Sequence, residues 1–243
     1  MNLKEFTATY REAFGEAAAL PLLFWYSEQP VRAVPKVEGC FFKALAEARA
    51  GMAVSLNAQN IGCGGGKFYT GFAPMPPFVP EFVSRKERYI RTPEMVLALI
   101  ERLDVRPAPA AWLTFARIDT PEAEEAFDRA EGVLFFARPD ELSGLVTWAL
   151  YDNDAEDAVR APFGSGCGAT VAHAVRENRR GGRSVFLGLF DPSVRPWVDA
   201  DVLSLTIPLG RFRELCGTMR ASCLFGTHAW SKVRDRINKE ADE

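Results

Sequence analysis

The chain has 243 residues, of which 48% are hydrophobic and 25% are charged, as is typical of a globular protein that buries a sizeable core. Its formal net charge of −3, with acidic and basic residues interleaved, argues against a nucleic-acid partner held by bulk electrostatics. The most apolar run, residues 17–26, contains Pro21 and is too short to span a bilayer, so we expect no membrane partner.

The N-terminal half begins with a predicted helix and a predicted buried strand. Asn2 and Glu5 have the spacing of a capping box at the start of a helix over residues 2–14. The apolar run over residues 22–26 predicts a strand. The elements expected next are a helix from Cys40 to Ala50 ended by Gly51, a strand over 52–56, an ordered proline-rich loop over 72–80, and a helix capped by Thr92 that ends near Leu103.

The C-terminal half alternates strands and helices. The predicted strands cover residues 111–118, 133–137, 184–188 and 202–206. The predicted helices begin at Thr120, cover 139–150, run from the segment around Cys167 to Arg179, and cover 209–222 and 227–239. The alternation is not regular enough for a doubly wound parallel sheet, so we expect an α/β or α+β fold with one mixed sheet and flanking helices. We expect a single globular domain over residues 1–243.

The two halves share a weak sequence likeness. Residues 38–42 can be laid over residues 131–136, and residues 53–64 over residues 158–168. The two alignments need different offsets, so chance matching of common residues explains them better than an internal duplication does.

A glycine-rich segment, Gly62-Cys63-Gly64-Gly65-Gly66, is the most distinctive stretch of the chain. Glycines permit positive φ and close backbone approach, and consecutive amides can converge on an anion or a thiolate. Gly166-Cys167-Gly168 repeats part of the pattern, and we expect the two loops to face one small-molecule site. The candidate ligand-binding residues are Cys63, Gly64, Gly65, Gly66, Lys67, Cys167 and Gly168, with the amide side chains of Asn57, Gln59 and Asn60 on the approach.

A second interpretation of the same segment is purely structural. Gly64 to Gly66 can form a tight turn with Lys67 in solvent, and the asparagines can cap turns. No Gly-Lys-Ser/Thr sequence follows the glycines, so the segment is not a P-loop.

Short motifs follow one another from Leu20 to about Leu215. They are Cys40-Phe41-Phe42-Lys43-Ala44, Cys63-Gly64-Gly65, Gly71-Phe72, Glu81-Phe82-Val83-Ser84, Arg88-Tyr89, Gly132-Val133-Leu134-Phe135-Phe136, Gly164-Ser165-Gly166-Cys167-Gly168 and Leu205-Thr206-Ile207-Pro208. As an ordered set they resemble the domain of unknown function 169 family, which has no established activity. The resemblance implies that Cys40, Cys63 and Cys167 occupy the cysteine positions of that family.

The three cysteines allow two interpretations. Cys40 and Cys167 each follow a glycine in the first turn of a predicted helix, and Cys63 lies among free backbone N–H groups. A helix start and free N–H groups each stabilise a thiolate and so lower the pKa of a thiol. Such thiols can bind a ligand or a soft metal, or cycle to a disulfide. Alternatively all three are small core residues, the interpretation we favour for Cys40. We expect no bound metal, because a fourth ligand and a short-spaced cysteine pair are both missing.

Two functional hypotheses therefore remain. The first is a protein that binds a small ligand or a metal at the two Gly-Cys-Gly loops, with its enzymatic status, its cofactor and its oligomeric state left open. The second is a non-catalytic interaction or scaffold protein whose glycines only permit tight turns. Five cysteines without a Cys-x-x-Cys pair, and no signal-peptide pattern, favour reduced thiols and a cytoplasmic location for either.

Overall fold

The fold is built on one mixed sheet, which the computed structural model describes within residues 2–163 and 166–241. In this part of the chain seven strands lie in the order β2-β3-β1-β4-β7-β6-β5. All pairs of neighbours are antiparallel except β5 and β6, which run parallel. The strands are β1 (Leu22–Ser27), β2 (Val54–Leu56), β3 (Trp112–Arg117), β4 (Gly132–Ala137), β5 (Val159–Arg160), β6 (Val185–Gly188) and β7 (Leu203–Pro208). The expectation of a mixed sheet is confirmed, and the fold is α+β.

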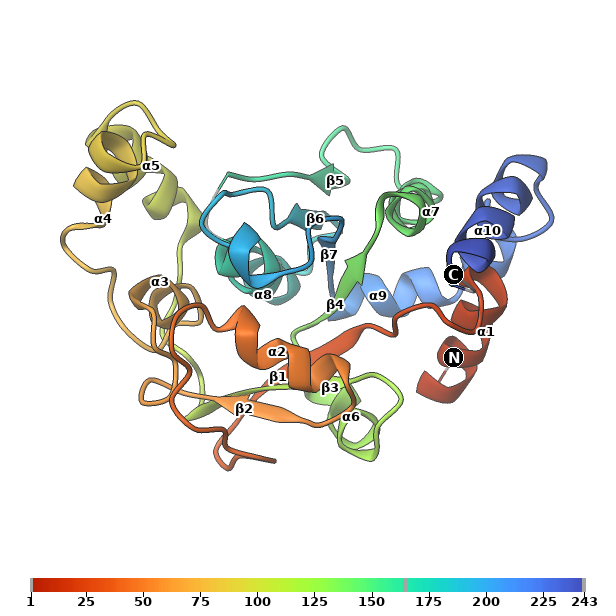
Figure 1. Cartoon of the computed structure of the whole chain (residues 1–243), viewed down its shortest axis with the longest axis horizontal. Helices are drawn as coiled ribbons and strands as arrows, with labels where there is room; N and C mark the ends of the chain where they lie inside the picture. The colour runs from red at the N-terminus through yellow and green to blue at the C-terminus, as the bar shows by residue number, and fades with distance from the viewer. Residues whose placement is uncertain (1, 164–165, 242–243) are drawn as a thin grey trace.

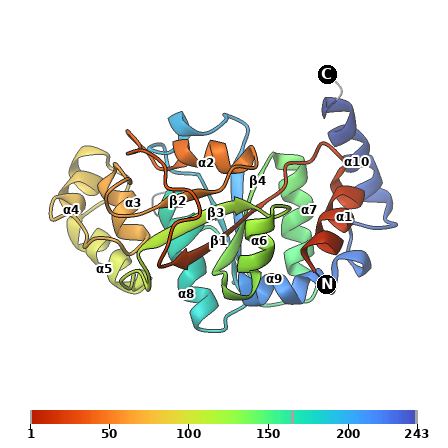
Figure 2. The same ribbon diagram turned by 90° about the horizontal axis from the view of Figure 1, so that it is seen from below.

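Helices cover both faces of this sheet. They are α1 (Leu3–Phe14), α2 (Phe42–Arg49), α3 (Gly64–Tyr69), α4 (Val79–Glu81), α5 (Pro93–Leu103), α6 (Pro121–Ala126), α7 (Pro139–Leu150), α8 (His173–Arg179), α9 (Leu209–Cys216) and α10 (His228–Ala241). Two π-helical segments, Phe82–Lys86 and Gly168–Ala172, continue α4 and precede α8. Figures 1 and 2 show α1, α7 and α10 gathered at one end, with α3, α4 and α5 at the opposite end.

The central strands explain why two separate cores form. Side chains alternate between the two faces of a strand, so Leu23 and Trp25 of β1 point to one core while Leu22 and Phe24 point to the other. Every residue of β4 is buried, as expected for a strand that is covered on both sides. The sheet therefore divides the apolar side chains into two clusters.

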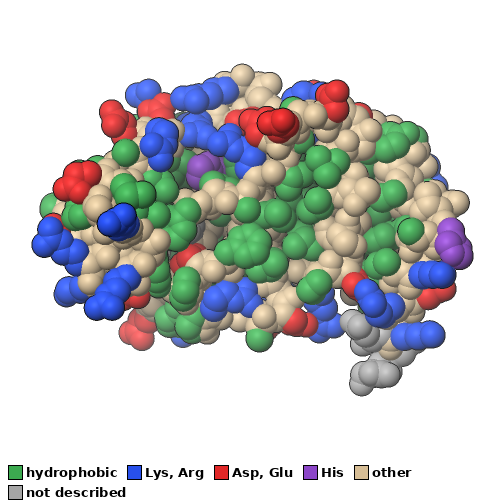
Figure 3. Space-filling view, turned by 90° about the horizontal axis from the view of Figure 1, so that it is seen from above, with side chains coloured by type: hydrophobic (Ala, Val, Ile, Leu, Met, Phe, Trp, Pro, Cys, Tyr) green, Lys and Arg blue, Asp and Glu red, His purple; other side chains and the backbone are tan. Residues whose placement is uncertain are grey.

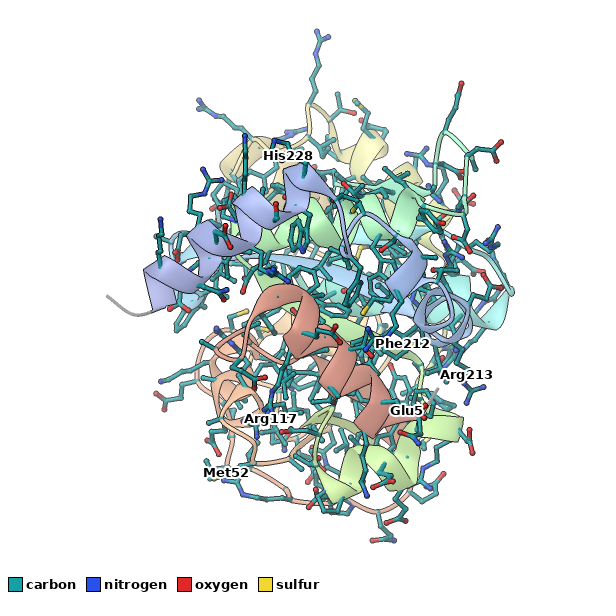
Figure 4. All side chains as sticks on the ribbon, turned by 90° about the vertical axis from the view of Figure 1, so that its right-hand side faces the viewer. Glu5, Met52, Arg117, Phe212, Arg213 and His228 are labelled. Carbon is teal, nitrogen blue, oxygen red and sulfur yellow. The ribbon has the colours of Figure 1, made fainter. Side chains whose placement is uncertain are left out.

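We name the two sides by what lies on them. The packed face carries α1, α6, α7, α9 and α10, and its core includes Trp25, Trp148 and Trp230. On this side Trp230 Nε1 donates to the carbonyl oxygen of Ala13 at 3.0 Å, which ties α10 to α1; Figure 4 shows the two helices side by side. The cavity face carries α2, α3 and α8, with α4 and α5 beside them.

Most predicted elements are confirmed, because local capping and periodicity determine them. Asn2 and Glu5 form the predicted capping box of α1, Thr92 caps α5 through Met95 N–H at 3.3 Å, and α7 covers the predicted residues 139–150. The predicted helix over 209–222 is too long, because α9 ends at Cys216 and a separate short turn follows.

Two local predictions on the cavity face are wrong. The helix expected from Cys40 begins only at Phe42, so Cys40 lies before the helix rather than in its first turn. Gly64–Tyr69 is a helix rather than a loop, and Gly62, Gly64, Gly65 and Gly66 all avoid positive φ. The loop expected over residues 72–80 is confirmed up to residue 78, because α4 begins only at Val79.

The weak likeness between the halves does not correspond to repeated structure at its first segment. Phe41 and Phe42 lie at the start of a helix, whereas Phe135 and Phe136 lie in β4. In the described ranges, none of the helices is long and apolar enough to cross a membrane.

Candidate functional site

A cavity of about 420 Å³ opens on the cavity face, between α3, α4, α5, the start of the helix that carries Cys167, and the loop after β6. Figure 1 shows α3, α4 and α5 at the left of the molecule, facing α8. Most of the wall is apolar. Its aromatic side chains are Tyr69, Phe78, Phe82, Tyr89, Phe163 and Trp197. Cys40, Cys63 and Cys167 all line this one cavity.

The mouth of the cavity exposes part of this apolar lining. Phe78 is 62% exposed, Phe163 39% and Trp197 40%. Figure 3 shows hydrophobic side chains gathered across the middle of the upper face of the molecule, with charged side chains around them. Apolar side chains therefore form part of the exposed rim of the cavity.

Cys40 and Cys63 form a hydrogen-bonded thiol pair in the cavity wall. The hydrogen bond from Cys40, together with those from the backbone N–H groups of Gly66 and Phe41, lowers the pKa of Cys63 to about 6 against the opposing effect of burial. The Gly66 N–H lies 3.3 Å from Cys63 Sγ. The hydrogen bond to Cys63, with burial, raises the pKa of Cys40. Within this pair the negative charge is therefore favoured on Cys63 rather than on Cys40.

Two of the glycines around Cys63 lie where a side chain would collide with neighbouring atoms. A Cβ on Gly66 would lie 2.8 Å from Cys63 Sγ and 2.9 Å from Ile61 Cγ2, and one on Gly62 would lie 2.1 Å from the carbonyl oxygen of Val37. A Cβ on Gly65 would meet nothing within 4 Å. Gly62 and Gly66 are thus needed for close approach, whereas the first turn of α3 would accept a side chain at Gly65.

The second Gly-Cys-Gly segment packs against Tyr69 of α3 and against Val194. A Cβ on Gly168 would lie 3.0 Å from the ring of Tyr69, which belongs to α3, and a Cβ on Gly166 would lie 2.9 Å from Val194. Cys167 is 4% exposed and directly precedes a π-helical segment. Both segments contribute to the same cavity wall. Gly164 and Ser165, which belong to the motif that resembles the family, lie outside the described residues.

The other candidate residues lie away from the cavity wall. Asn57 Oδ1 accepts from the backbone N–H groups of Gln59 and Asn60, and Asn60 Nδ2 donates to the carbonyl oxygens of Val34 and Ser55. Gln59 is exposed. These asparagines therefore brace the turn that leads into α3. Lys67 lies in α3 but not in the cavity wall, and we leave these four side chains out of the site that we propose.

Sequence reasoning missed a polar end of the cavity. Asp191 and Ser193 lie in the wall, and the Ser193 hydroxyl donates to Asp191 Oδ1. Asp191 is 5% exposed, and its Oδ2 has no hydrogen-bond partner in the described structure. Asp191 follows β6 and precedes Pro192, a sequence that indicates a turn. That signal places an acid after a strand but does not reveal which groups surround it.

His173, His228 and Arg179 lie outside this site. His173 is buried against the ring of Phe186, with centroids 5.3 Å apart, and burial lowers its pKa to about 4. Arg179 pairs with Glu131 at 2.5 Å, so it belongs to an ion-paired helix end. No group of three or more His, Cys, Asp or Glu side chains in the described ranges is arranged to hold a metal ion.

Comparison with known proteins identifies the family but no activity. No curated protein and no solved structure matches the chain. The family model of DUF169, described as an uncharacterised ArCR, matches residues 22–217. This range agrees with the region from Leu20 to about Leu215 in which the sequence motifs lie. The match covers most of the chain and includes all three cysteines of the cavity, and the protein therefore belongs to the DUF169 family.

Proposed function

We propose that this protein binds a small, largely apolar molecule in the cavity and contacts it through the Cys63 thiolate. The observation that carries the proposal is the position of a hydrogen-bonded thiol pair, Cys40 and Cys63, in the wall of an otherwise apolar cavity of about 420 Å³. Cavities of this size, lined by aromatic side chains and a few polar groups, are the usual form of small-molecule sites.

The contrast with the remaining cysteines supports a chemical role for Cys63. Burial raises the pKa of Cys216 to about 12 and also raises the pKa of Cys223, as expected for thiols in apolar surroundings. Cys63 is partly exposed and accepts hydrogen bonds from Cys40 and from backbone N–H groups, so its pKa falls instead. A thiolate at an accessible apolar wall can attack an electrophilic carbon or bind a soft group.

The backbone around the cavity supports the same proposal. Phe82 and Val83 of the π-helical segment Phe82–Lys86 line it, and the segment Gly168–Ala172 begins directly after Cys167 of the wall. π-Helical turns interrupt the regular hydrogen bonding of a helix and occur often at functional sites. Their presence on the cavity face fits a wall shaped for a ligand rather than for maximal helix stability.

The test compares two reagents that alkylate thiols, iodoacetamide and N-benzyl iodoacetamide. If the cavity binds apolar molecules beside Cys63, the rate of labelling by the benzyl reagent will saturate with concentration, because reversible binding precedes the reaction. Labelling of Cys223, measured in the same samples by peptide mass spectrometry, will stay linear. A linear dependence at Cys63 for both reagents would overturn the proposal.

A pair of variants on α5 controls for the cavity itself. Leu99 lies in the cavity wall, whereas Leu97 on the same helix is 48% exposed and lies outside it. Leu99→Trp should fill the space and abolish saturation by the benzyl reagent, and Leu97→Trp should leave it unchanged. Labelling by iodoacetamide itself reports whether Cys63 keeps its reactivity in both variants.

A further inference from the structure

The polar end of the cavity contains a buried carboxylate with an unused acceptor. Asp191 is 5% exposed, and only its Oδ1 is engaged, by the hydroxyl of Ser193. Oδ2 is buried and has no hydrogen-bond partner within the described ranges. A carboxylate oxygen removed from water and left without a donor is costly. No group in residues 2–163 and 166–241 supplies the missing donor, and Asp191 lines the cavity, from which a ligand can supply it.

The charges around Asp191 favour a cation as that donor. The described residues of the cavity wall include no lysine, arginine or histidine. Arg195, close to Asp191 in sequence, instead donates to the carbonyl oxygens of Leu189 and Val202, and to those of Asp199 and Ala200. The negative charges of Asp191 and the Cys63 thiolate therefore face the cavity without a cation from the wall.

Aromatic rings supply a second feature that binds cations. Tyr89 and Phe163 lie edge to face with ring centroids 6.1 Å apart, and both line the cavity with Trp197. The faces of such rings attract ammonium groups, most strongly where water is excluded. An ammonium group near Asp191 thus meets a carboxylate and π-systems in the same space.

The backbone holds this end of the cavity in an unusual conformation. Leu189, two residues before Asp191, has φ of 68°, and Arg88, directly before Tyr89, has φ of 58°. Left-handed φ is uncommon for residues with a Cβ, and it persists where the surrounding structure imposes it. Both left-handed residues lie within two positions of a residue of the cavity wall, Tyr89 or Asp191.

We propose that the ligand of this cavity is a small amine, with an apolar body against the aromatic wall and a protonated nitrogen that donates to Asp191 Oδ2. This inference rests on the proposed function, because it assigns the ligand class of the same cavity. The amine inference differs from the proposed function in a testable way, because an apolar cavity alone would bind neutral molecules more tightly than charged ones.

The experiment measures binding of three probes with the same aromatic body, phenethylamine, phenethyl alcohol and phenylacetate, by isothermal titration calorimetry. We expect phenethylamine to bind at least about tenfold more tightly than the alcohol, because a charge-assisted hydrogen bond is stronger than a neutral one. Phenylacetate should bind most weakly of the three. Phenethylamine should also slow iodoacetamide labelling of Cys63.

Asp191→Asn keeps an oxygen for Ser193 but removes the charge, and Asp199→Asn is its matched control on an exposed loop. The first should lower the affinity for phenethylamine about tenfold and leave phenethyl alcohol unaffected, which also shows that the cavity is intact. The second should change neither affinity.

The outcomes separate the two proposals. If labelling by N-benzyl iodoacetamide saturates but phenethylamine binds no more tightly than the alcohol, the inference of an amine ligand is wrong. The proposal of an apolar binding site beside Cys63 is then still supported. An amine preference that survives Asp191→Asn would overturn the role of Asp191. Linear labelling and no binding of any probe would overturn both proposals.

Discussion

The packed face and the cavity face share one sheet but differ in how their space is filled. On the packed face, aromatic rings from different elements interlock: Phe212 of α9 lies 4.8 Å from Phe6 of α1, and Phe14 of α1 lies 5.1 Å from Trp230 of α10, measured between ring centroids. On the cavity face, aromatic side chains such as Phe163 stand at the edge of an open space and remain partly exposed.

The cavity face also differs in its glycines. Gly39, Gly64, Gly65, Gly66 and Gly166 all line the cavity. A Cβ on Gly39, Gly66 or Gly166 would lie 2.5–2.9 Å from a neighbouring side chain, so these glycines allow other groups to come close together. The same face also holds the low-pKa thiol, the unpartnered carboxylate and the left-handed backbone at Leu189. We expect the packed face to contribute most of the stability, and we place the proposed chemistry on the cavity face.

The largest expected effect tests the packing difference directly. Phe212→Ala removes a ring with no exposed surface from the packed face, whereas Phe163→Ala removes a ring that is 39% exposed at the cavity mouth. We expect losses in the free energy of unfolding of about 3–5 kcal/mol for the first and less than about 1 kcal/mol for the second. Urea denaturation followed by circular dichroism measures both. Equal losses would show that the two faces do not differ in packing.

A smaller effect concerns the pH dependence of stability on the cavity face. Burial lowers the pKa of His173 to about 4, while an unfolded histidine titrates near 6.5. Between these values the unfolded state takes up a proton that the folded state does not, so stability falls as the pH is lowered from about 6.5 to about 4, by up to roughly 3 kcal/mol.

His173→Gln removes this group without introducing a charge. Its free energy of unfolding, measured with urea at pH 7 and at pH 4.5, should fall less with acid than that of the original protein. His228→Gln is the control, because His228 is exposed at the start of α10. An unchanged pH dependence in His173→Gln would contradict a buried neutral histidine.

The next effect tests the thiol pair. The rate of iodoacetamide labelling at Cys63 should rise with pH through a midpoint near 6, because only the thiolate reacts. Cys40→Ala removes the strongest hydrogen bond to that thiolate and should raise the midpoint by about one pH unit or more, equivalent to about 1.4 kcal/mol. Cys223→Ala should not move it. A midpoint that stays the same without Cys40 would show that the pair is not coupled.

The smallest effect separates two neighbouring glycines in α3. Gly65→Ala meets open space and should stabilise the protein by up to about 1 kcal/mol, since alanine favours a helix over glycine. Gly66→Ala places a Cβ 2.8 Å from Cys63 Sγ, so it should destabilise the fold and slow labelling of Cys63. The same urea and labelling measurements apply. If the two variants have the same stability and the same labelling rate, the close contact at Gly66 has no role in the site.

Much of the fold could be predicted because its signals are local. The capping box of Asn2 and Glu5, the Thr92-Pro93 start of α5 and the apolar run of β4 each depend on residues within a few positions. The glycine-flanked cysteines were also recognisable, since a thiol among glycines is unusual. They line the same cavity, and their membership of one ligand site stays a prediction.

The sequence by itself thus determined the order of helices and strands, the presence of one mixed sheet, and the family to which the chain belongs. Only the tertiary structure decided that Cys40 donates to Cys63, that the glycines start a helix, and that Asp191 ends the cavity with an unused oxygen. The physical reason is distance along the chain. Helices and strands arise from contacts between near neighbours, whereas pKa values, close approaches and unpartnered polar atoms depend on groups that only folding brings together.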